Sequence, residues 1–521
     1  MCSPAGIFLF YSIIIVKSID FIMDREPSIL INQGVGGFSR KINEISRDCI
    51  LGKIVPRVVG FLFLFISICY MASPYMTKGM FFVRDEIIVN YWSWKLNWQD
   101  FFYLFPNGKH DDRPVGWIFV NLINYAVGLN YHAQLSFFII VHFINTILLY
   151  KFVKTIFTEE YYSFLAAFIF ACHFPANSTV HYIGAVFDLL CCTFSLISLI
   201  LFQKNQRVAL FFSVLCYFVS VRSKEMSVLL PGVLTLLVWA QYNGRQQEML
   251  KNILRRCWPF YIVLLMMMAF FLSSKRIGYD VDVNHPIAMK FSSGVFIDNL
   301  KLYLLTLMFY TNQHLIIMLS FFAFAASLLG NYRLMFFSAM SFILMLTPVL
   351  FYTHHRFNWF LYIPSIFFSI VIVIFIRNII SLINKIFFGK FTIYSVKIML
   401  FTVVFFMILS IPLTERYHNY MNEEKKERIP IGKLYTYLKE RIPLVKTGTH
   451  FYLKNIPNIA ANQAPDWLIL DYLFRIIYED DSLVVFTDNM YPNIFDKYVN
   501  DMSPSIFLEY SENGFNQVEK Y

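Results

Sequence analysis

The stretch "HAQLSFFIIVHFINTILLYKFV" at residues 132–153 decides the class of this protein. An α-helix of that length rises about 33 Å at ~1.5 Å per residue, which is enough to cross the ~30 Å hydrocarbon core of a bilayer. Similar apolar runs recur between residues 58 and 414. Because a chain in lipid must satisfy its backbone polar groups within its own helices, this repetition predicts an all-α polytopic membrane protein.

The composition agrees with this prediction. The 521 residues are 57% hydrophobic with a mean hydropathy of +0.54, whereas soluble domains are about 45–50% apolar. The 58 phenylalanines and 32 tyrosines suit lipid-facing and interfacial positions. The net charge of +10 reports membrane topology rather than nucleic-acid binding, so the lipid bilayer is the expected partner. The eight cysteines are interpreted as packing residues, because they form no disulfide framework.

The apolar runs predict eleven spans, and basic residues set their orientation. The expected spans lie at roughly 58–74, 132–153, 161–174, 182–203, 208–221, 226–242, 258–274, 315–331, 333–352, 360–377 and 395–414. The shorter apolar stretch 297–313 is expected to be a re-entrant or interfacial helix. This assignment keeps the basic residues of the later loops on one side, as the positive-inside rule requires. The N-terminal segment, 1–57, is then cytoplasmic and the C-terminus lies outside.

The last part of the chain, 415–521, differs in composition. It holds 16 of the 34 acidic residues against 12 lysines and arginines. "THFYLKNIPN" (449–458) and "SLVVFTD" (482–488) have the pattern of strands, and "APDWLILDYLFRIIYEDD" (464–481) that of an amphipathic helix. We therefore expect a small extracytoplasmic α/β domain attached to a transmembrane domain at 58–414.

An acidic pair, Asp85–Glu86, follows the first span in "VRDEIIVN" (83–90). The predicted outer loop around it, 75–131, also contains Asp112 and is the most acidic loop before the tail. Carboxylates at a membrane boundary can serve as a general base, as metal ligands or as a helix cap. These residues alone leave the three roles open.

Two further polar features lie in or beside the predicted spans. Asp188 in "HYIGAVFDLLCC" is about a third of the way into a span, where a carboxylate costs ~2.5–3.5 kcal/mol. It is either functional or a buried contact to a neighbouring helix. "VRSKEMSVLLPG" (221–232) places Arg222, Lys224 and Glu225 at the outer boundary. Fixed cations there suit a lipid phosphate, and interfacial snorkelling is the alternative.

Histidines flank two predicted outer turns. His181 follows one of them, and His355 and Arg356 lie in the other. Each is more often structural when taken alone, and we expect them to converge with the acidic pair on one face. Adjacent helical residues point about 100° apart, and the sequence has no HxxxH or HExxH spacing. The histidines therefore predict no strong metal site, and a divalent cation is left open.

The order of these motifs resembles a known family. The acidic pair is followed by "DDRPVGWIFVNLINYAVGLNYHAQLSFFIIVHFINTILLY", "HFPANSTVHYIGAVFDLL", "RSKEMSVLLPGVL" and "FLYIPSIFF". Over roughly residues 58–376 the chain is similar to GT-C-fold membrane glycosyltransferases, in particular the transmembrane mannosyltransferases with TPR tails and their bacterial relatives. This resemblance implies a GT-C-like fold, without the TPR tail, that takes sugar from a polyprenyl-phosphate carrier on the non-cytoplasmic side.

The resemblance also implies roles for particular residues. Asp85, with Glu86 beside it, would act at the acceptor, and Arg222 and Lys224 would bind the carrier phosphate. Arg113, in the "RP" motif, would shape the outer loop.

The chain departs from the family pattern at two motifs. Where the family often has Gly-Arg-x-Asp, this chain has Ala185-Val186-Phe187-Asp188, so an arginine is missing. A Glu-Arg-Tyr-Leu-Tyr-like motif is replaced by 358–362, "NWFLY", with Arg356 nearby as a substitute phosphate ligand.

The function implied is an inverting hexosyltransferase of the bacterial inner membrane. Its donor would be a polyprenyl-phosphate-linked sugar, with glucose as the first choice. Its acceptor would be O-antigen or another surface glycan, a lipid or a protein. The resemblance names no definite cofactor and leaves a divalent metal open. The alternatives are a transporter or flippase, or a polymerase, of lipid-linked sugars.

Overall fold

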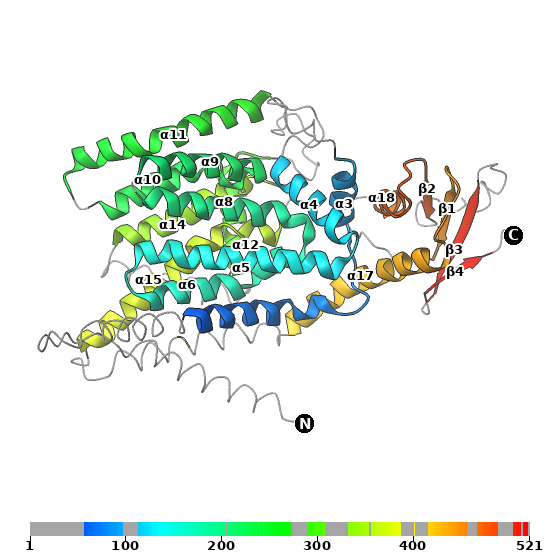
Figure 1. The fold of residues 1–521 in the computed structure, drawn as a ribbon. Coiled ribbons are helices and arrows are strands. Elements are labelled where there is room, and N and C mark those ends of the chain that lie inside the picture. The colour runs from blue at the N-terminus through cyan, green and yellow to red at the C-terminus, as the bar shows by residue number, and fades with distance from the viewer. Residues whose placement is uncertain are drawn as a thin grey trace, which may run out of the picture.

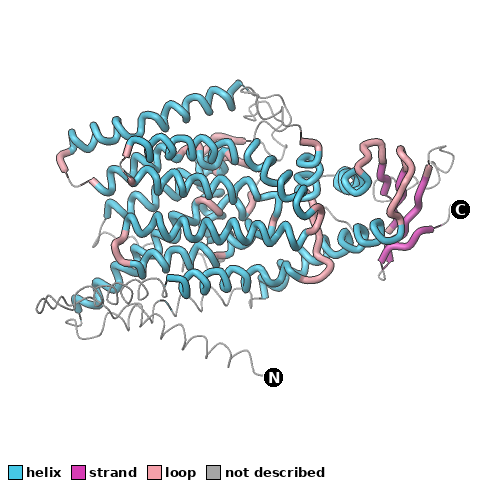
Figure 2. Tube along the Cα trace, viewed as in Figure 1, coloured by secondary structure: helices cyan, strands magenta, loops and turns pink. Residues whose placement is uncertain are grey.

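The computed structural model describes residues 57–96, 113–204, 206–242, 244–273, 289–307, 332–353, 356–386, 401, 415–455, 466–487, 504–511 and 514–518. Within them the chain forms a helical bundle joined to a small α/β domain (Figures 1 and 2). The main helices are α3 (Asp85–Trp94), α4 (Pro114–Val127), α5 (Tyr131–Ile156), α6 (Glu160–Cys172), α7 (Phe174–His181), α8 (Val186–Gln203), α9 (Arg207–Ser223), α10 (Leu230–Gln241), α11 (Gln246–Ser273), α12 (Ser293–Leu307), α14 (Tyr332–Leu346), α15 (Pro364–Ile386), α17 (Glu415–Arg441) and α18 (Asp466–Tyr478).

Five helices of the described chain are long and apolar enough to cross a membrane. They are Arg57–Met76, Tyr131–Ile156, Ile183–Gln203, Tyr332–Val349 and Pro364–Ser381. Shorter apolar helices occupy Pro114–Val127, Glu160–Cys172 and Glu225–Gln241. The prediction of a helical membrane protein is thus confirmed, whereas a count of eleven spans goes beyond what these helices establish. The expected spans 315–331 and 395–414, and the segment 1–56, lie outside the described residues.

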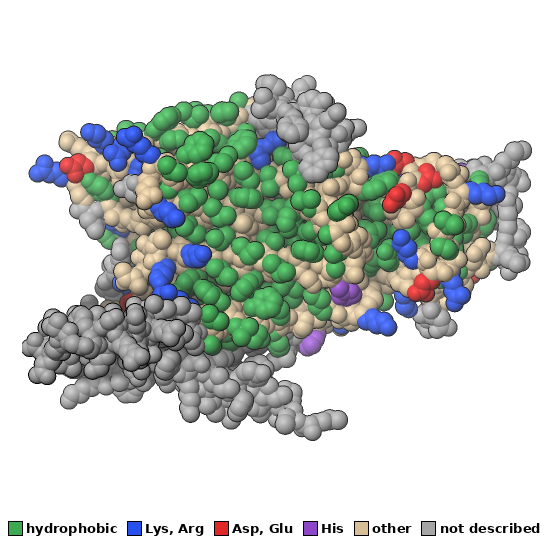
Figure 3. All heavy atoms as spheres, in the orientation of Figure 1, with side chains coloured by type: hydrophobic (Ala, Val, Ile, Leu, Met, Phe, Trp, Pro, Cys, Tyr) green, Lys and Arg blue, Asp and Glu red, His purple; other side chains and the backbone are tan. Residues whose placement is uncertain are grey.

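The bundle packs around α8 and presents apolar side chains outward. Helices α5 and α9 both pack against α8, in which Cys191, Cys192 and Leu196 are fully buried. On the outside, large side chains such as Phe211 and Leu265 are exposed, and apolar surface covers the middle of the face seen in Figure 3. An apolar belt of this extent is unfavourable in water and favourable in lipid.

The two ends of the bundle differ in charge. At one end, where the turn between α10 and α11 lies, basic side chains gather on the visible face (Figures 1 and 3). At the other end lies α3, next to the C-terminal α/β domain (Figure 1). The turn between α7 and α8, Ile183–Ala185, packs against α3 at this end. We call this second end the domain end.

The C-terminal domain contains a four-stranded sheet of order β2-β1-β3-β4. Its strands are β1 (His450–Lys454), β2 (Val484–Thr487), β3 (Ser505–Ser511) and β4 (Gly514–Val518). Strand β1 is parallel to β2 and β3, and β4 is antiparallel to β3. Between β1 and β2 the chain forms α18, as a parallel crossover requires. The three elements expected in the tail coincide with β1, α18 and β2.

Helix α17 joins the bundle to this domain (Figure 1). Ile431, Leu434 and Leu438 on one face of α17 are buried. Gly432 lies against the loop that precedes α3: a Cβ atom added there would stand 2.3 Å from the carbonyl oxygen of Gly79. Only glycine permits this close approach of the two backbones. Helix α17 therefore packs directly on the loop that leads to the acidic pair.

Candidate functional site at the domain end

The acidic pair begins α3. Asp85 and Glu86 occupy the first turn, where the helix dipole favours negative charge. The preceding residue, Arg84, has φ 49° and ψ −131°, which is a strained conformation for a residue with a side chain. The loop therefore makes a sharp, costly turn just before Asp85, and surrounding contacts must hold it.

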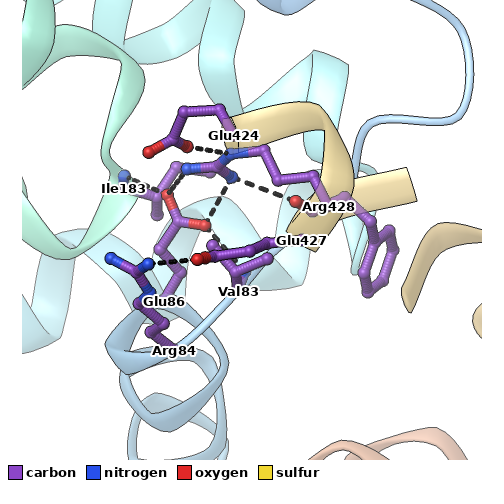
Figure 4. A network of polar contacts seen from close by, with 8 residues as sticks. Val83, Arg84, Glu86, Ile183, Glu424, Glu427 and Arg428 are labelled. Atoms are coloured by element: carbon purple, nitrogen blue, oxygen red, sulfur yellow. Dashed lines mark hydrogen bonds and ion pairs between the residues drawn. The ribbon is translucent and has the colours of Figure 1, made fainter. Parts of the chain in front are cut away.

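Glu86 is fully buried, and both carboxylate oxygens are engaged (Figure 4). Oε2 accepts hydrogen bonds from the backbone N–H of Val83 (2.8 Å) and from Nη1 of Arg428 (2.7 Å). Oε1 accepts from the backbone N–H of Ile183 (2.9 Å) and from Nη2 of Arg428 (3.2 Å). The bond to Val83 is a local reach-back of the capping kind. Glu86 thus fixes three segments of the chain, and this network leaves it no accessible oxygen.

Arg428, on α17, is the centre of this network. Its side chain is 2% exposed. Besides Glu86 it donates to Glu424 (2.8 Å, from Nε) and to the carbonyl oxygen of Phe81 (3.0 Å). The neighbouring residue Glu427 forms an ion pair with Arg84 (Figure 4). A buried guanidinium with this many charge-assisted partners holds a fixed geometry.

Asp85 differs from Glu86, because its side chain is exposed. The hydroxyl of Tyr182 is within hydrogen-bonding reach of the Asp85 carboxylate, and Arg84 acts on it electrostatically. The protein around Asp85 nevertheless desolvates it enough to raise its pKa above the ordinary value. Tyr182 stays protonated, because burial and Asp85 raise its pKa well above the usual value. Asp85 is thus an accessible carboxylate with a raised pKa.

A pocket lies next to Arg84 and Tyr182, the neighbours of Asp85, although Asp85 itself does not line it. It is lined by Tyr75, Val83, Arg84, Ser178, His181, Tyr182, Asn358, Trp359, Tyr420, Glu424 and Arg428. Tyr182 stacks on Trp359 with ring centroids 4.5 Å apart, and Phe357 stacks on Trp359 at 4.1 Å. Aromatic rings with a few placed polar groups are typical of small-molecule sites.

His181 is buried in the wall of this pocket. Its ring stacks on Tyr75 at 3.7 Å. Within the described residues neither ring nitrogen makes a well-aligned hydrogen bond, although the carbonyl oxygen of Met71 lies near. Burial, together with the positive charge of Arg428, lowers the pKa of His181 well below its ordinary value. His181 is therefore a neutral ring, and it lies near the acidic pair as its position in the sequence predicted.

A second group of charges lies around the start of α8. Lys224 Nζ contacts Asp188 Oδ2 at 2.5 Å, with both side chains buried. Arg113 binds Glu225 through two hydrogen bonds of 2.7 and 3.1 Å. Asp188 lies in the first turn of α8 and inside the apolar helix Ile183–Gln203, toward the end of that candidate span. Lys224 was expected to bind the carrier phosphate and Arg113 to shape the outer loop. In the structure both are paired with acidic side chains.

The other predicted residues are placed as follows. Arg222 is buried in the last turn of α9, and Arg356 is exposed. Asp112 and His355 lie outside the described residues. Helices α3 and α4, which begin at Asp85 and directly after Arg113, lie at the domain end of the bundle (Figure 1).

One segment connects the two groups of charges. Tyr182 reaches Asp85, the N–H of Ile183 binds Glu86, and Asp188 binds Lys224. The Lys224 ammonium also lies 4.9 Å from the centroid of Phe360, a neighbour of Trp359. A single site with an acidic side and a basic side can therefore form along this segment.

The structure adds residues that the sequence pattern did not indicate. Glu424, Glu427 and Arg428 belong to the charged run "NEEKKERIP" (422–430) on α17, which has the composition of a solvated helix face. Tyr182 carries no chemical signature of its own. Among the described residues no group of three His, Cys, Asp or Glu side chains is arranged to hold a metal ion.

Comparisons with known proteins add no assignment. No protein-family model matches the chain, and no curated protein matches it in sequence. The described structure itself defines the class: a helical membrane protein with a small α/β domain at one end of its bundle.

Proposed function

We propose that this protein is a membrane glycosyltransferase that moves a hexose from a polyprenyl-phosphate carrier to a hydroxyl of an acceptor. The observation that carries the proposal is the contrast between two adjacent carboxylates. Glu86 is buried and fully bonded, whereas Asp85 is accessible and lies between Arg84 and Tyr182, which both line an aromatic pocket. Burial raises the pKa of both carboxyl groups, but only Asp85 can be reached by an acceptor. A general base needs an open position and a pKa closer to the working pH.

The charge distribution supports separate places for the acceptor and for the donor phosphate. Around Asp85 the carboxylates of Asp85, Glu86, Glu424 and Glu427 face the guanidinium groups of Arg84 and Arg428. On the other side Arg113 and Lys224 pair with Glu225 and Asp188. Arg222 precedes Lys224 in the last turn of α9, and Arg356 is exposed. A donor phosphate is therefore assigned to the basic side. A neutral sugar hydroxyl is assigned to the acidic side.

The reaction is a single displacement. The acceptor oxygen forms a bond to the anomeric carbon as the bond from that carbon to the phosphate oxygen breaks. Asp85 takes the acceptor proton, and the polyprenyl phosphate leaves with its charge stabilised by the fixed cations. Attack opposite to the leaving group inverts the anomeric centre, as in inverting glycoside chemistry.

The proposal extends to fold and location. A GT-C-like architecture with eleven spans would place the domain end outside the cytoplasm. The concentration of basic side chains at the opposite end of the bundle supports that orientation. In this orientation the long lipid carrier lies in the membrane and the acceptor arrives from the aqueous side. The bacterial inner membrane is the proposed location.

The test is a transfer assay with purified protein in lipid nanodiscs. Undecaprenyl-phosphoglucose is the first donor probe and O-antigen polysaccharide the first acceptor, with lipid A as the second, each run with and without EDTA. We expect acceptor-dependent release of undecaprenyl phosphate and its loss in Asp85→Asn, with unchanged folding. Near-normal transfer in Asp85→Asn would overturn the assignment of the base.

The same assay separates the enzyme from a carrier. A flippase moves intact undecaprenyl-phosphoglucose between leaflets and releases no undecaprenyl phosphate, whereas a transferase releases it in step with product. A polymerase would also release it but would add successive hexoses to the same glycan, so its product would carry a chain of added hexoses rather than one.

A further inference from the structure

The tripeptide Arg84-Asp85-Glu86 is held on both sides of its central residue. Arg84 pairs with Glu427, and Glu86 pairs with Arg428 (Figure 4). Two consecutive residues of α17 thus bind the two residues that flank Asp85. The carboxylate of Asp85 instead lies within reach of the Tyr182 hydroxyl.

The rest of α3 is fixed by other elements. Asn121 of α4 donates to the carbonyl oxygen of Ser93 (2.8 Å). On the side of α18, Tyr472 stacks on Tyr91 at 4.4 Å, and Asp481 accepts a hydrogen bond from the Tyr91 hydroxyl (3.0 Å). These contacts hold the C-terminal half of α3. Its first turn is held by α17 and by the N–H of Ile183, which binds Glu86.

Strain at Arg84 makes that dependence strong. Its positive φ is unfavourable for a residue with a side chain, and such conformations persist only when surrounding contacts impose them. The close approach of Gly432 to Gly79 brings α17 onto the same loop. Without the two ion pairs, Arg84 and Glu86 lose their contacts with α17, and the strained loop can relax around the remaining bond from Ile183 to Glu86.

We propose that α17 is the positioning element for Asp85, and that Glu427 and Arg428 act as positioning residues through Arg84 and Glu86. This inference rests on the proposed role of Asp85 as the base. It also assigns a role to the C-terminal part of the chain, because the helix that leads to the α/β domain sets the geometry of the site.

The first experiment uses Glu427→Gln, because the Arg84–Glu427 pair is partly exposed and its loss leaves no fully buried charge. Its matched control is Glu423→Gln, on the same helix, in the exposed pair with Lys426. We expect Glu427→Gln to lower kcat severalfold with little change in the KM for donor, and Glu423→Gln to behave as the parent. Equal kcat in both variants overturns the proposal.

The pH dependence of kcat/KM is a second test, because a purely structural role of Glu427 would leave its acidic limb unchanged. The groups that act on Asp85 are Tyr182 and Arg84, with Glu427 behind Arg84. Once Glu427 is neutral, Arg84 is free to pair with Asp85 and lowers the pKa of Asp85. We expect the acidic limb of the kcat/KM profile to move to lower pH in Glu427→Gln and to stay in place in Glu423→Gln.

A second measurement is independent of catalysis. Asp85→Cys is labelled with a membrane-impermeant maleimide, alone and combined with Glu427→Gln or Glu423→Gln, against the parent chain as background. We expect severalfold faster labelling only in the Glu427→Gln combination. If Glu427→Gln changes the labelling rate of Asp85→Cys while Asp85→Asn remains active, the role of Asp85 as the base is wrong and the positioning role of α17 stands. If the labelling rate is unchanged while Asp85→Asn is inactive, the positioning role of α17 is wrong and the role of Asp85 as the base stands.

Discussion

Arg428 donates two hydrogen bonds to the carboxylate of Glu86, although 342 positions separate them in the chain. Both side chains are almost wholly buried. The pair joins the helix that leads to the C-terminal domain to the loop after the first apolar helix. It converts one member of the acidic pair into a structural anchor and leaves Asp85 as the accessible one.

Arg428→Met is expected to destabilise the fold strongly. It would leave the Glu86 carboxylate buried without its counter-ion, and breaking a buried pair from one side costs about 3–5 kcal/mol. Thermal unfolding in detergent measures the loss. Lys426→Met is the control, since its pair with Glu423 is exposed and such pairs contribute ~0–1 kcal/mol. Glu86→Gln combined with Arg428→Met should recover part of the loss; a double variant no more stable than Arg428→Met would contradict the account.

Tyr182→Phe is expected to shift the acidic limb of the pH–rate profile upward. The Tyr182 hydroxyl lowers the pKa of Asp85, against burial, which raises it. A general base works when deprotonated, so activity falls as pH drops through this pKa. Removing the hydroxyl raises the pKa and moves that fall to higher pH. Measuring kcat/KM across the acidic and neutral pH range tests this prediction. A shift of the acidic limb to lower pH in Tyr182→Phe would contradict it.

Substitutions at Lys224 and at Asp188 are expected to affect the KM for the donor differently. If the basic side holds the carrier phosphate, Lys224→Met removes a cation and raises the KM for undecaprenyl-phosphoglucose severalfold. Asp188→Asn removes the acid that neutralises Lys224, so the KM should stay the same or fall. Initial rates over a donor series in the same nanodiscs measure both. A rise of equal size in the two variants would indicate a structural pair with no phosphate role.

Gly432→Ala is expected to weaken the packing of α17 on the loop before α3. The added Cβ would lie 2.3 Å from the carbonyl oxygen of Gly79, which is backbone and cannot turn aside. We expect faster proteolysis within 415–441 and a lower kcat. Gly294→Ala, where an added Cβ meets nothing within 4 Å, is the control. Equal protease resistance in both variants would contradict the close approach.

The outline of the fold followed from local pattern. Apolar runs of sufficient length predicted membrane helices because the bilayer imposes both length and composition on any spanning segment. Strand, helix and strand in the tail were predicted from their own periodicity, and β1, α18 and β2 lie there. Asp188 was singled out because an ionised group within a span is costly. Asp85, Glu86 and Lys224 were singled out because they lie at the predicted outer boundary, and Arg113 by the resemblance to membrane glycosyltransferases.

The sequence by itself determined that this chain enters a membrane and that its unusual charges collect at one end of the predicted spans. Only the tertiary structure decided what each charge does. Glu86 and Asp85 are neighbours with the same chemistry, yet one meets Arg428 in a dry interior and the other faces Tyr182 at an open edge. Desolvation and ion pairing depend on groups that folding brings from hundreds of residues away, so local sequence carries no record of them.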